Sequence, residues 1–217
     1  MKKNIEIELR INLKNRFDMK NTLDFYTKIY DPLVEKNYGK SLDRSGPALK
    51  IFKKFAKNNN VKIKNVIDVG CRWGKALKYW QGRRIKSIGV DVSKNIVDYC
   101  NKRKLNCYLA SATDLSIFED KKFDLYMATD VYEHLRTEDL GHAINEAKRV
   151  TKKYLLIRPH PTLDRRGRKN IKEALHLTVW SLEKWQKFFE DNGLNVIKVG
   201  ENGDIIYKNT FLMSINK

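Results

Sequence analysis

Short apolar runs recur along the middle of this chain and alternate with segments of helical periodicity. The runs, rich in valine, isoleucine and leucine, are 65–70, 86–92, 106–111, 123–130 and 154–159. The segments with apolar residues at helical spacing are 75–82, 94–103, 133–150 and 181–192. Strands that are apolar on both faces have to be covered on both faces. The alternation therefore predicts an α/β fold, with a doubly wound, mostly parallel sheet between two layers of helices.

Both ends of the chain extend this pattern. Residues 5–13 alternate strictly between apolar and polar and predict a strand with no evident partner. Helices are expected at 22–37 and 47–58, the second with Pro47 at its first position. After Gly193, the segments 195–200 and 204–215 predict two closing strands, one of them antiparallel because the intervening "ENG" is too short for a crossover helix. The sheet then has seven strands.

Length and composition fit one domain. The chain has 217 residues, of which 41% are hydrophobic. We expect a single domain over 1–217, with a helical cap at 1–60 and a core at 61–217 that carries a basic loop at 159–180. No run of 18 apolar residues predicts a membrane span, and the N-terminus has no apolar leader, so we expect a cytoplasmic protein. The three cysteines are odd in number and lack CxxC spacing, which implies no disulfide or zinc framework.

The chain is strongly basic, with a formal net charge of +18. The densest stretch is 152–172, where eight lysines and arginines accompany one acidic residue, Asp164. Two interpretations stay open: this stretch contacts an anionic substrate, or it is a solvated loop in a lysine-rich sequence.

A glycine turn follows the first apolar run, in "NVIDVGCRWGKALKYW" (65–80). Gly70 and Gly74 allow the backbone to approach a ligand at the mouth of the next helix, and Asp91 ends the following strand, where a carboxylate accepts hydrogen bonds from ribose hydroxyls. The dinucleotide spacing G-x-G-x-x-G and the Walker-type phosphate loop are both missing. A nucleoside without phosphates is the ligand that remains.

Four stretches of the sequence together resemble one enzyme family. They are "VIDVGCRWG", "GVDVS", "ATDLSIFEDKKFDLYMATDVYEHL" and "HLTVWSLEKWQKFFEDNGL". In order and spacing they resemble the class I S-adenosylmethionine-dependent methyltransferases, particularly the type 11 group, over about residues 45 to 200. The resemblance implies a Rossmann-like fold, S-adenosylmethionine as the cofactor, and transfer of its methyl group.

The resemblance also implies a set of cofactor-binding residues. Asp91 would bind the ribose, and 110–112 would hold the adenine. In the family the place of Ser111 is often acidic, so the adenine amino group would be bound by Ser111 more weakly or by Asp114. An alternative role for Asp68 is a buried carboxylate that caps the turn. The full set is Asp68, Gly70, Cys71, Arg72, Gly74, Asp91, Val92, Ser111, Ala112 and Asp130.

Arg72 occupies the place of the usual middle glycine of the turn. A negative φ there carries no strain, whereas a positive φ costs about 1 to 3 kcal/mol. The guanidinium would pair with the carboxylate of the cofactor. The rival interpretation is a degraded cofactor site in a non-catalytic relative.

The motif "DVYEHL" supplies the candidate catalytic residues Asp130, Glu133 and His134, which share one face if a helical turn begins at the strand end. His134 would be a general base. Alternatively, these three residues with His176 would bind Mg²⁺ or another divalent ion, a set that resembles the 2′-O-methyltransferases of small-RNA 3′ ends. A purely structural role for the motif is the third alternative.

The acceptor is expected to be oxygen. No Asp/Asn-Pro-Pro-Tyr motif follows the fourth strand, which disfavours amino methylation of adenine or glutamine. No cysteine has a Pro-Cys context, which disfavours methylation of cytosine at C5. Trp180 and Trp185 fall at helical spacing and favour a core role over base stacking. We therefore expect O-methylation of a small metabolite or sugar. The alternatives are an RNA 2′-O-methyltransferase, which the charge favours, and an inactive methyltransferase-like binding protein.

Overall fold

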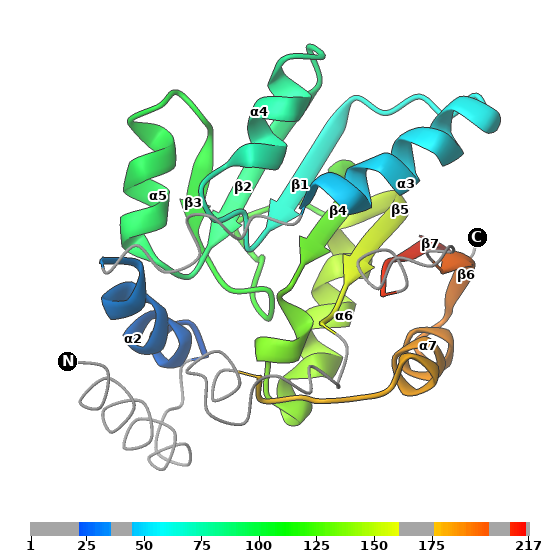
Figure 1. Ribbon diagram of the computed structural model, residues 1–217. Coiled ribbons are helices and arrows are strands. Elements are labelled where there is room, and N and C mark those ends of the chain that lie inside the picture. Colours follow the sequence, from blue (N-terminus) through cyan, green and yellow to red (C-terminus); the bar gives the residue numbers. More distant parts are fainter. Residues whose placement is uncertain (1–21, 36–44, 161–175, 200–208, 216–217) are drawn as a thin grey trace.

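The computed structural model describes residues 22–35, 45–160, 176–199 and 209–215, which form one seven-stranded sheet with helices on both sides (Figure 1). The strands are β1 (Asn65–Val69), β2 (Lys86–Asp91), β3 (Cys107–Leu109), β4 (Phe123–Thr129), β5 (Thr151–Arg158), β6 (Leu194–Val199) and β7 (Phe211–Ile215). The helices are α2 (Thr22–Glu35), α3 (Ser45–Asn58), α4 (Lys75–Gln81), α5 (Lys94–Asn101), α6 (Leu140–Val150) and α7 (Leu182–Asp191). The predicted fold class is confirmed.

The strand order is β3-β2-β1-β4-β5-β7-β6. The first five strands run parallel, and β7 lies antiparallel between β5 and β6. The predicted antiparallel closing pair is therefore confirmed. The chain leaves β1 toward β2 on one side and returns to place β4 on the other, so the switch point lies between β1 and β4. In sheets of this kind ligands bind at the switch point, beyond the carboxyl ends of the strands.

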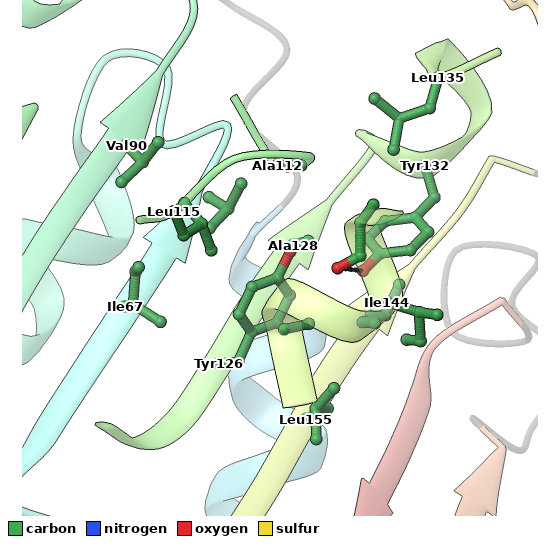
Figure 2. Close-up of a cluster of buried hydrophobic side chains, with 14 of the residues drawn as sticks. Ile67, Val90, Ala112, Leu115, Tyr126, Ala128, Tyr132, Leu135, Ile144 and Leu155 are labelled. Atoms are coloured by element: carbon green, nitrogen blue, oxygen red, sulfur yellow. Dashed lines mark hydrogen bonds between the residues drawn. The ribbon is translucent and has the colours of Figure 1, made fainter. Parts of the chain in front are cut away.

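Two apolar layers hold the helices on the sheet. One layer joins Ile67, Tyr126 and Leu155 on the strands to Ile144 of α6 and Trp185 of α7; Figure 2 shows the strand side chains and Ile144 facing one another. The other layer packs α3 and α4 against the opposite face. Trp185 is fully buried, which agrees with the core role expected of it.

The expected helix over 133–150 is interrupted. The chain instead forms two 3-10 turns, η1 (Tyr132–His134) and η2 (Thr137–Asp139), and α6 begins only at Leu140. Leu135 and Arg136 between the turns are extended, with ψ of 147° and 149°. Thr178 Oγ1 donates to the carbonyl of Leu135 at 2.7 Å, which holds this extended backbone in place. A shared helical face for the "DVYEHL" motif is therefore wrong.

Other expectations on element bounds had mixed outcomes. α3 begins at Ser45, so Pro47 is its third residue and not its first. The last strand is Phe211–Ile215, and residues 204–208 of the range expected for it lie outside the described residues. The strand expected at 5–13 and most of the basic loop, 161–175, lie outside the described residues. Among the helices that the structure describes, none combines the length and apolar character needed to cross a bilayer.

Candidate active site

A cavity of about 770 Å³, including its open mouth, lies where the carboxyl ends of β1, β2 and β4 meet. Helix α2 forms its far wall with Tyr26 and Tyr30. This helix is tied to the sheet because Thr27 Oγ1 donates to the carbonyl of Val92 at 2.6 Å. The residues on the cavity wall are Tyr26, Tyr30, Val34, Val69, Gly70, Arg72, Trp73, Asp91, Val92, Ile96, Ala110, Ser111, Ala112, Asp130, Val131, His134 and Leu135.

The glycine turn after β1 is fixed against β2. The amides of Gly70 and Cys71 both donate to the carbonyl of Val90, at 2.7 and 3.0 Å. Gly70 has a φ of +68°, and a Cβ there would lie 2.4 Å from Cγ2 of Val131. Glycine is therefore required at this position, both by the left-handed backbone and by the close approach of Val131, which follows β4.

Replacing Gly70 by alanine is expected to lower the free energy of unfolding by about 2 to 4 kcal/mol, because left-handed strain adds to the clash with a stiff β-branched side chain. For a chain of this size that is a fall of roughly 5 to 15 °C in melting temperature. The matched control is Gly141→Ala in α6, where an added Cβ meets nothing within 4 Å. Thermal unfolding of both variants tests this, and equal melting temperatures for the two would contradict it.

Arg72 has a φ of +48°, so the left-handed alternative applies and the backbone carries strain of about 1 to 3 kcal/mol. Its amide donates to Oδ2 of Asp91 at 3.0 Å, which holds the strained conformation. Arg72 lines the cavity, and its charge counteracts part of the rise that burial causes in the pKa of Glu133. The same charge adds to the fall that burial causes in the pKa of His176. The turn therefore carries a cation into the cavity where a third glycine was expected.

Asp91 lies at the end of β2 with both carboxylate oxygens oriented by the backbone. Oδ1 accepts from the amide of Ser93, and Oδ2 accepts from the amide of Arg72, each at 3.0 Å. Burial raises the pKa of Asp91 to about 6, and these two hydrogen bonds counteract part of that rise. Each oxygen keeps a further lone pair, so the carboxylate has acceptor capacity for hydroxyl groups in the cavity.

Six more of the expected cofactor residues divide between the cavity wall and the interior. Val92, Ser111 and Ala112 line the cavity. The hydroxyl of Ser111 is already paired with the Thr113 hydroxyl at 2.8 Å. Asp114 does not reach in, because its Oδ1 accepts from the amide of Ser116 and it is not on the wall.

Asp68, Cys71 and Gly74 are not on the cavity wall. Asp68 is buried within β1. The sulfur of Cys71 points to Cys107, 3.3 Å away. A Cβ on Gly74 would meet Leu105 at 2.5 Å, so this glycine serves packing on α5 and its flanking turn. Side-chain contacts of Asp68 and Cys71 with a ligand in the cavity are therefore disfavoured, and Gly74 is not on the cavity wall.

Asp130 forms a buried ion pair with Arg158, the last residue of β5. Asp130 has a φ of +56°, and its amide donates to the carbonyl of Arg158 at 2.8 Å. The carboxylate is thus held by Arg158 and is not among the donor atoms that gather around Glu133. Arg158 was missed by the sequence analysis, although an arginine inside the apolar run "YLLIRP" is the signal that could have found it.

Glu133, His134 and His176 form the second polar cluster, with donor atoms within 4.8 Å of one another. Nε2 of His134 lies 3.9 Å from Oε1 of Glu133, and the His134 and His176 rings meet edge to face at 4.9 Å. His134 is the member on the cavity wall. The structure thus brings together three of the four residues expected to bind a metal, without Asp130.

Backbone hydrogen bonds explain how His176 reaches His134 from 42 positions away. The amides of Leu177 and Thr178 both donate to the carbonyl of Glu133, at 2.8 and 3.0 Å. The segment that follows β5 in the chain is thereby fastened to η1. Periodicity gives no signal for such a contact, so only the resemblance pointed to His176.

Burial sets the charges of this cluster. It raises the pKa of Glu133 to about 8, with a further contribution from the nearby Asp130 carboxylate. Burial, with the nearby His160, lowers the pKa of His176 to about 4. Neither carboxylate oxygen of Glu133 makes a well-aligned hydrogen bond to a residue that the structure describes. At neutral pH the cluster is therefore a protonated acid beside a neutral imidazole.

Comparisons with known proteins agree with this fold. Residues 67–156 match the methyltransferase domain family. A S-adenosylmethionine-dependent methyltransferase from Archaeoglobus fulgidus covers 85% of this chain and 99% of its own, with 18% identity and a TM-score of 0.62. One from Aquifex aeolicus covers 77% and 87%, with 25% identity and a TM-score of 0.55.

A further solved structure has a bound ligand. Magnesium protoporphyrin IX methyltransferase from Synechocystis, with bound S-adenosylhomocysteine, covers 90% of this chain and 100% of its own, with 13% identity and a TM-score of 0.69. A search of curated protein sequences finds no match. The likeness to these structures lies in the fold.

Proposed function

We propose that this chain is a class I S-adenosylmethionine-dependent methyltransferase that methylates an oxygen atom of a small metabolite or sugar. The match of residues 67–156 to the methyltransferase domain and the fold support the family. The observation that carries the proposal is the position of His134: its imidazole shares one cavity wall with Gly70 and Asp91. A proton acceptor thus lies beside the residues proposed to hold the cofactor.

The cofactor half of the cavity has a donor and acceptor pattern that suits S-adenosylmethionine. Asp91 would accept hydrogen bonds from the ribose hydroxyls, and the small side chains of Ala110 and Ala112 leave room for the adenine ring. The guanidinium of Arg72 would pair with the carboxylate of the methionine part. The fold family supports this cofactor, and the residue roles are part of the proposal.

The acceptor half has the groups that an oxygen nucleophile needs. His134 would take the proton from the hydroxyl while the oxygen attacks the methyl carbon in line with the breaking carbon–sulfur bond, whose electron pair stays on sulfur. Tyr30 packs edge to face on the His134 ring at 5.7 Å and limits its rotation. The products are the methyl ether, S-adenosylhomocysteine and a protonated imidazole that returns its proton to solvent.

The same cluster also fits a divalent ion. The observation that favours an ion is that neither buried carboxylate oxygen of Glu133 is hydrogen-bonded to a residue in the described part of the chain. Glu133, His134 and His176 would hold the ion. A bound ion would lower the pKa of an acceptor hydroxyl. Ion binding would also compensate the cost of burying this carboxylate.

An assay of methyl transfer from labelled S-adenosylmethionine tests the proposal. The acceptors are a panel of small hydroxyl compounds, matched amino compounds and short RNAs, each with Mg²⁺ and with chelator. We expect label on a hydroxyl compound. Label on amines alone, or on RNA alone, would contradict the proposed acceptor class.

A further inference from the structure

Three buried cysteines meet on the side of the glycine turn away from the cavity. Cys71 lies in the turn, Cys100 on α5 and Cys107 at the start of β3. Their sulfur atoms all lie within 4.8 Å of one another, and the Cys71 and Cys107 sulfurs are 3.3 Å apart. All three are free thiols. Sequence spacing implied no metal framework, because the three residues come from separate elements.

The fold makes room for these sulfur atoms with two glycines. A Cβ on Gly89 of β2 would lie 2.7 Å from the sulfur of Cys71, and one on Gly74 would lie 3.2 Å from that of Cys100. Asn101 fixes the third position, since its side chain accepts from the amide of Cys107 at 3.0 Å and donates to its carbonyl at 2.9 Å. The backbone around the cluster is therefore held from several sides.

The spacing of the sulfurs fits a common metal ion. With metal–sulfur bonds of about 2.3 Å, ligand sulfurs lie about 3.8 to 4.0 Å apart, which the cluster reaches with small side-chain rotations. The surroundings are apolar, with Leu77, Ile96 and Leu105 in contact with the cluster. Thiolates are soft ligands that prefer zinc, cadmium and monovalent copper over magnesium or calcium.

The cationic side chains of Arg103 and Lys78 act electrostatically on Cys100. The thiolate is the form that binds metal. Positive charge beside the cluster also offsets the net negative charge of a metal bound by three thiolates.

We propose that Cys71, Cys100 and Cys107 form a binding site for a thiophilic metal ion of the Zn²⁺, Cd²⁺ or Cu⁺ class. The site lies directly behind the turn whose next residue, Arg72, donates to Asp91. A bound ion would tie α5 and β3 to that turn. The proposal rests on the cysteine cluster alone and is independent of the acceptor chemistry.

The plain alternative is that the thiols are ordinary buried side chains, since free cysteine is among the most buried residue types. Titration of the full chain with Cd²⁺, reduced and under anaerobic conditions, separates the two. The readout is the ultraviolet charge-transfer absorption of the cadmium–thiolate bond, which carboxylate and imidazole ligands do not produce. We expect one Cd²⁺ per chain, and absence of the band at equimolar Cd²⁺ would overturn the proposal.

Single serine substitutions assign the ligands. Cys71→Ser and Cys107→Ser are each expected to weaken Cd²⁺ binding by about 100-fold or more, since even indirect supports of a metal site contribute 10- to 100-fold. His176→Gln in the other donor cluster is the control and should keep the band. Circular dichroism checks that each variant is folded. A band of full intensity in both folded serine variants would overturn the proposal.

Competition identifies the ion. Zn²⁺ and Cu⁺ are added separately to the cadmium-loaded chain, and loss of the band reports displacement. Displacement by either ion supports the site and names its occupant. A band that neither ion removes at tenfold excess would overturn Zn²⁺ and Cu⁺ as occupants of the site.

Discussion

Replacing His134 by glutamine is expected to lower kcat for methyl transfer by about 10²- to 10⁴-fold, the usual contribution of a general base. Glutamine has a similar size and keeps a polar group on the cavity wall, but its amide does not accept a proton near neutral pH. The imidazole is placed by Glu133, 3.9 Å from its Nε2, and by the edge of His176. Steady-state kinetics with the acceptor identified by screening give the measurement.

His142→Gln is the matched control for this prediction. His142 is exposed on α6 and away from the cavity wall, so its replacement should leave kcat within about twofold.

A chelator distinguishes the two proposed roles of the cluster, proton acceptance by His134 and binding of a divalent ion. If His134 acts as a base, chelator leaves the wild-type rate unchanged; if the cluster holds a divalent ion, chelator and Glu133→Gln each reduce the rate as strongly as His134→Gln. Wild-type kcat in His134→Gln would exclude both roles.

Replacing Asp91 by asparagine is expected to weaken binding of S-adenosylhomocysteine by about 10- to 100-fold, or about 1.4 to 3 kcal/mol. The change keeps the side chain's shape but replaces one acceptor oxygen by a donor. If the NH₂ group faces the backbone, it replaces the oxygen that accepts from the amide of Arg72 or Ser93. If it faces the cavity, it replaces the oxygen that would accept from a ribose hydroxyl. Calorimetric titration of the two proteins gives the two dissociation constants.

Asp98→Asn serves as the control for Asp91→Asn. Asp98 is on α5, where its exposed carboxylate pairs with Lys94 at 2.6 Å. Its replacement removes the same charge from the same part of the fold but not from the cavity, so the dissociation constant should stay within about twofold. An unchanged dissociation constant in Asp91→Asn would contradict the proposed hydrogen bonds between Asp91 and the ribose.

The pH dependence of binding gives a second test of Asp91. Its pKa in the free protein is about 6, so the carboxylate is charged above pH 6 and protonated below it. Hydrogen bonds from ribose hydroxyls favour the charged form. Affinity should therefore be constant above pH 6 and fall by up to about tenfold per pH unit below it. In Asp91→Asn this dependence should disappear.

Much of the fold could be predicted because its determinants are local. Apolar runs such as 123–130 and the turns between them identify the strands, and Gly70 and Asp91 at successive strand ends locate the cavity. The antiparallel closing pair followed from the length of its connection. These features depend on residues within a few positions of one another, so periodicity and turn chemistry are sufficient.

The details of the site depend on contacts between distant residues, which periodicity does not reveal. Asp130 is paired with Arg158, although spacing alone grouped it with Glu133. The extended backbone at Leu135 is held by Thr178, which lies 43 positions away. The left-handed conformation of Arg72 depends on the Asp91 carboxylate. Each of these is a tertiary contact that overrides a local preference.

The cysteine cluster is the clearest case of information that appears only after folding. Cys71, Cys100 and Cys107 have no metal-binding spacing in the sequence. Parallel pairing of β2 with β3 aligns Gly89 with Cys107, and the absence of a side chain at Gly89 lets the sulfur of Cys71 lie beside it. Strand register, which the sequence did not define, brings the three sulfurs together.

The central claim is that the cavity binds S-adenosylmethionine, and calorimetric titration of the full chain with S-adenosylhomocysteine tests it most directly. The titration is done at pH 7.5, about 1.5 pH units above the pKa of Asp91, where this carboxylate is charged. The account predicts one site per chain with a dissociation constant on the order of micromolar, about 8 kcal/mol of binding free energy. An absence of binding heat together with an unchanged melting temperature would contradict it. That result would mean that the cavity between β1, β2 and β4 does not hold the cofactor.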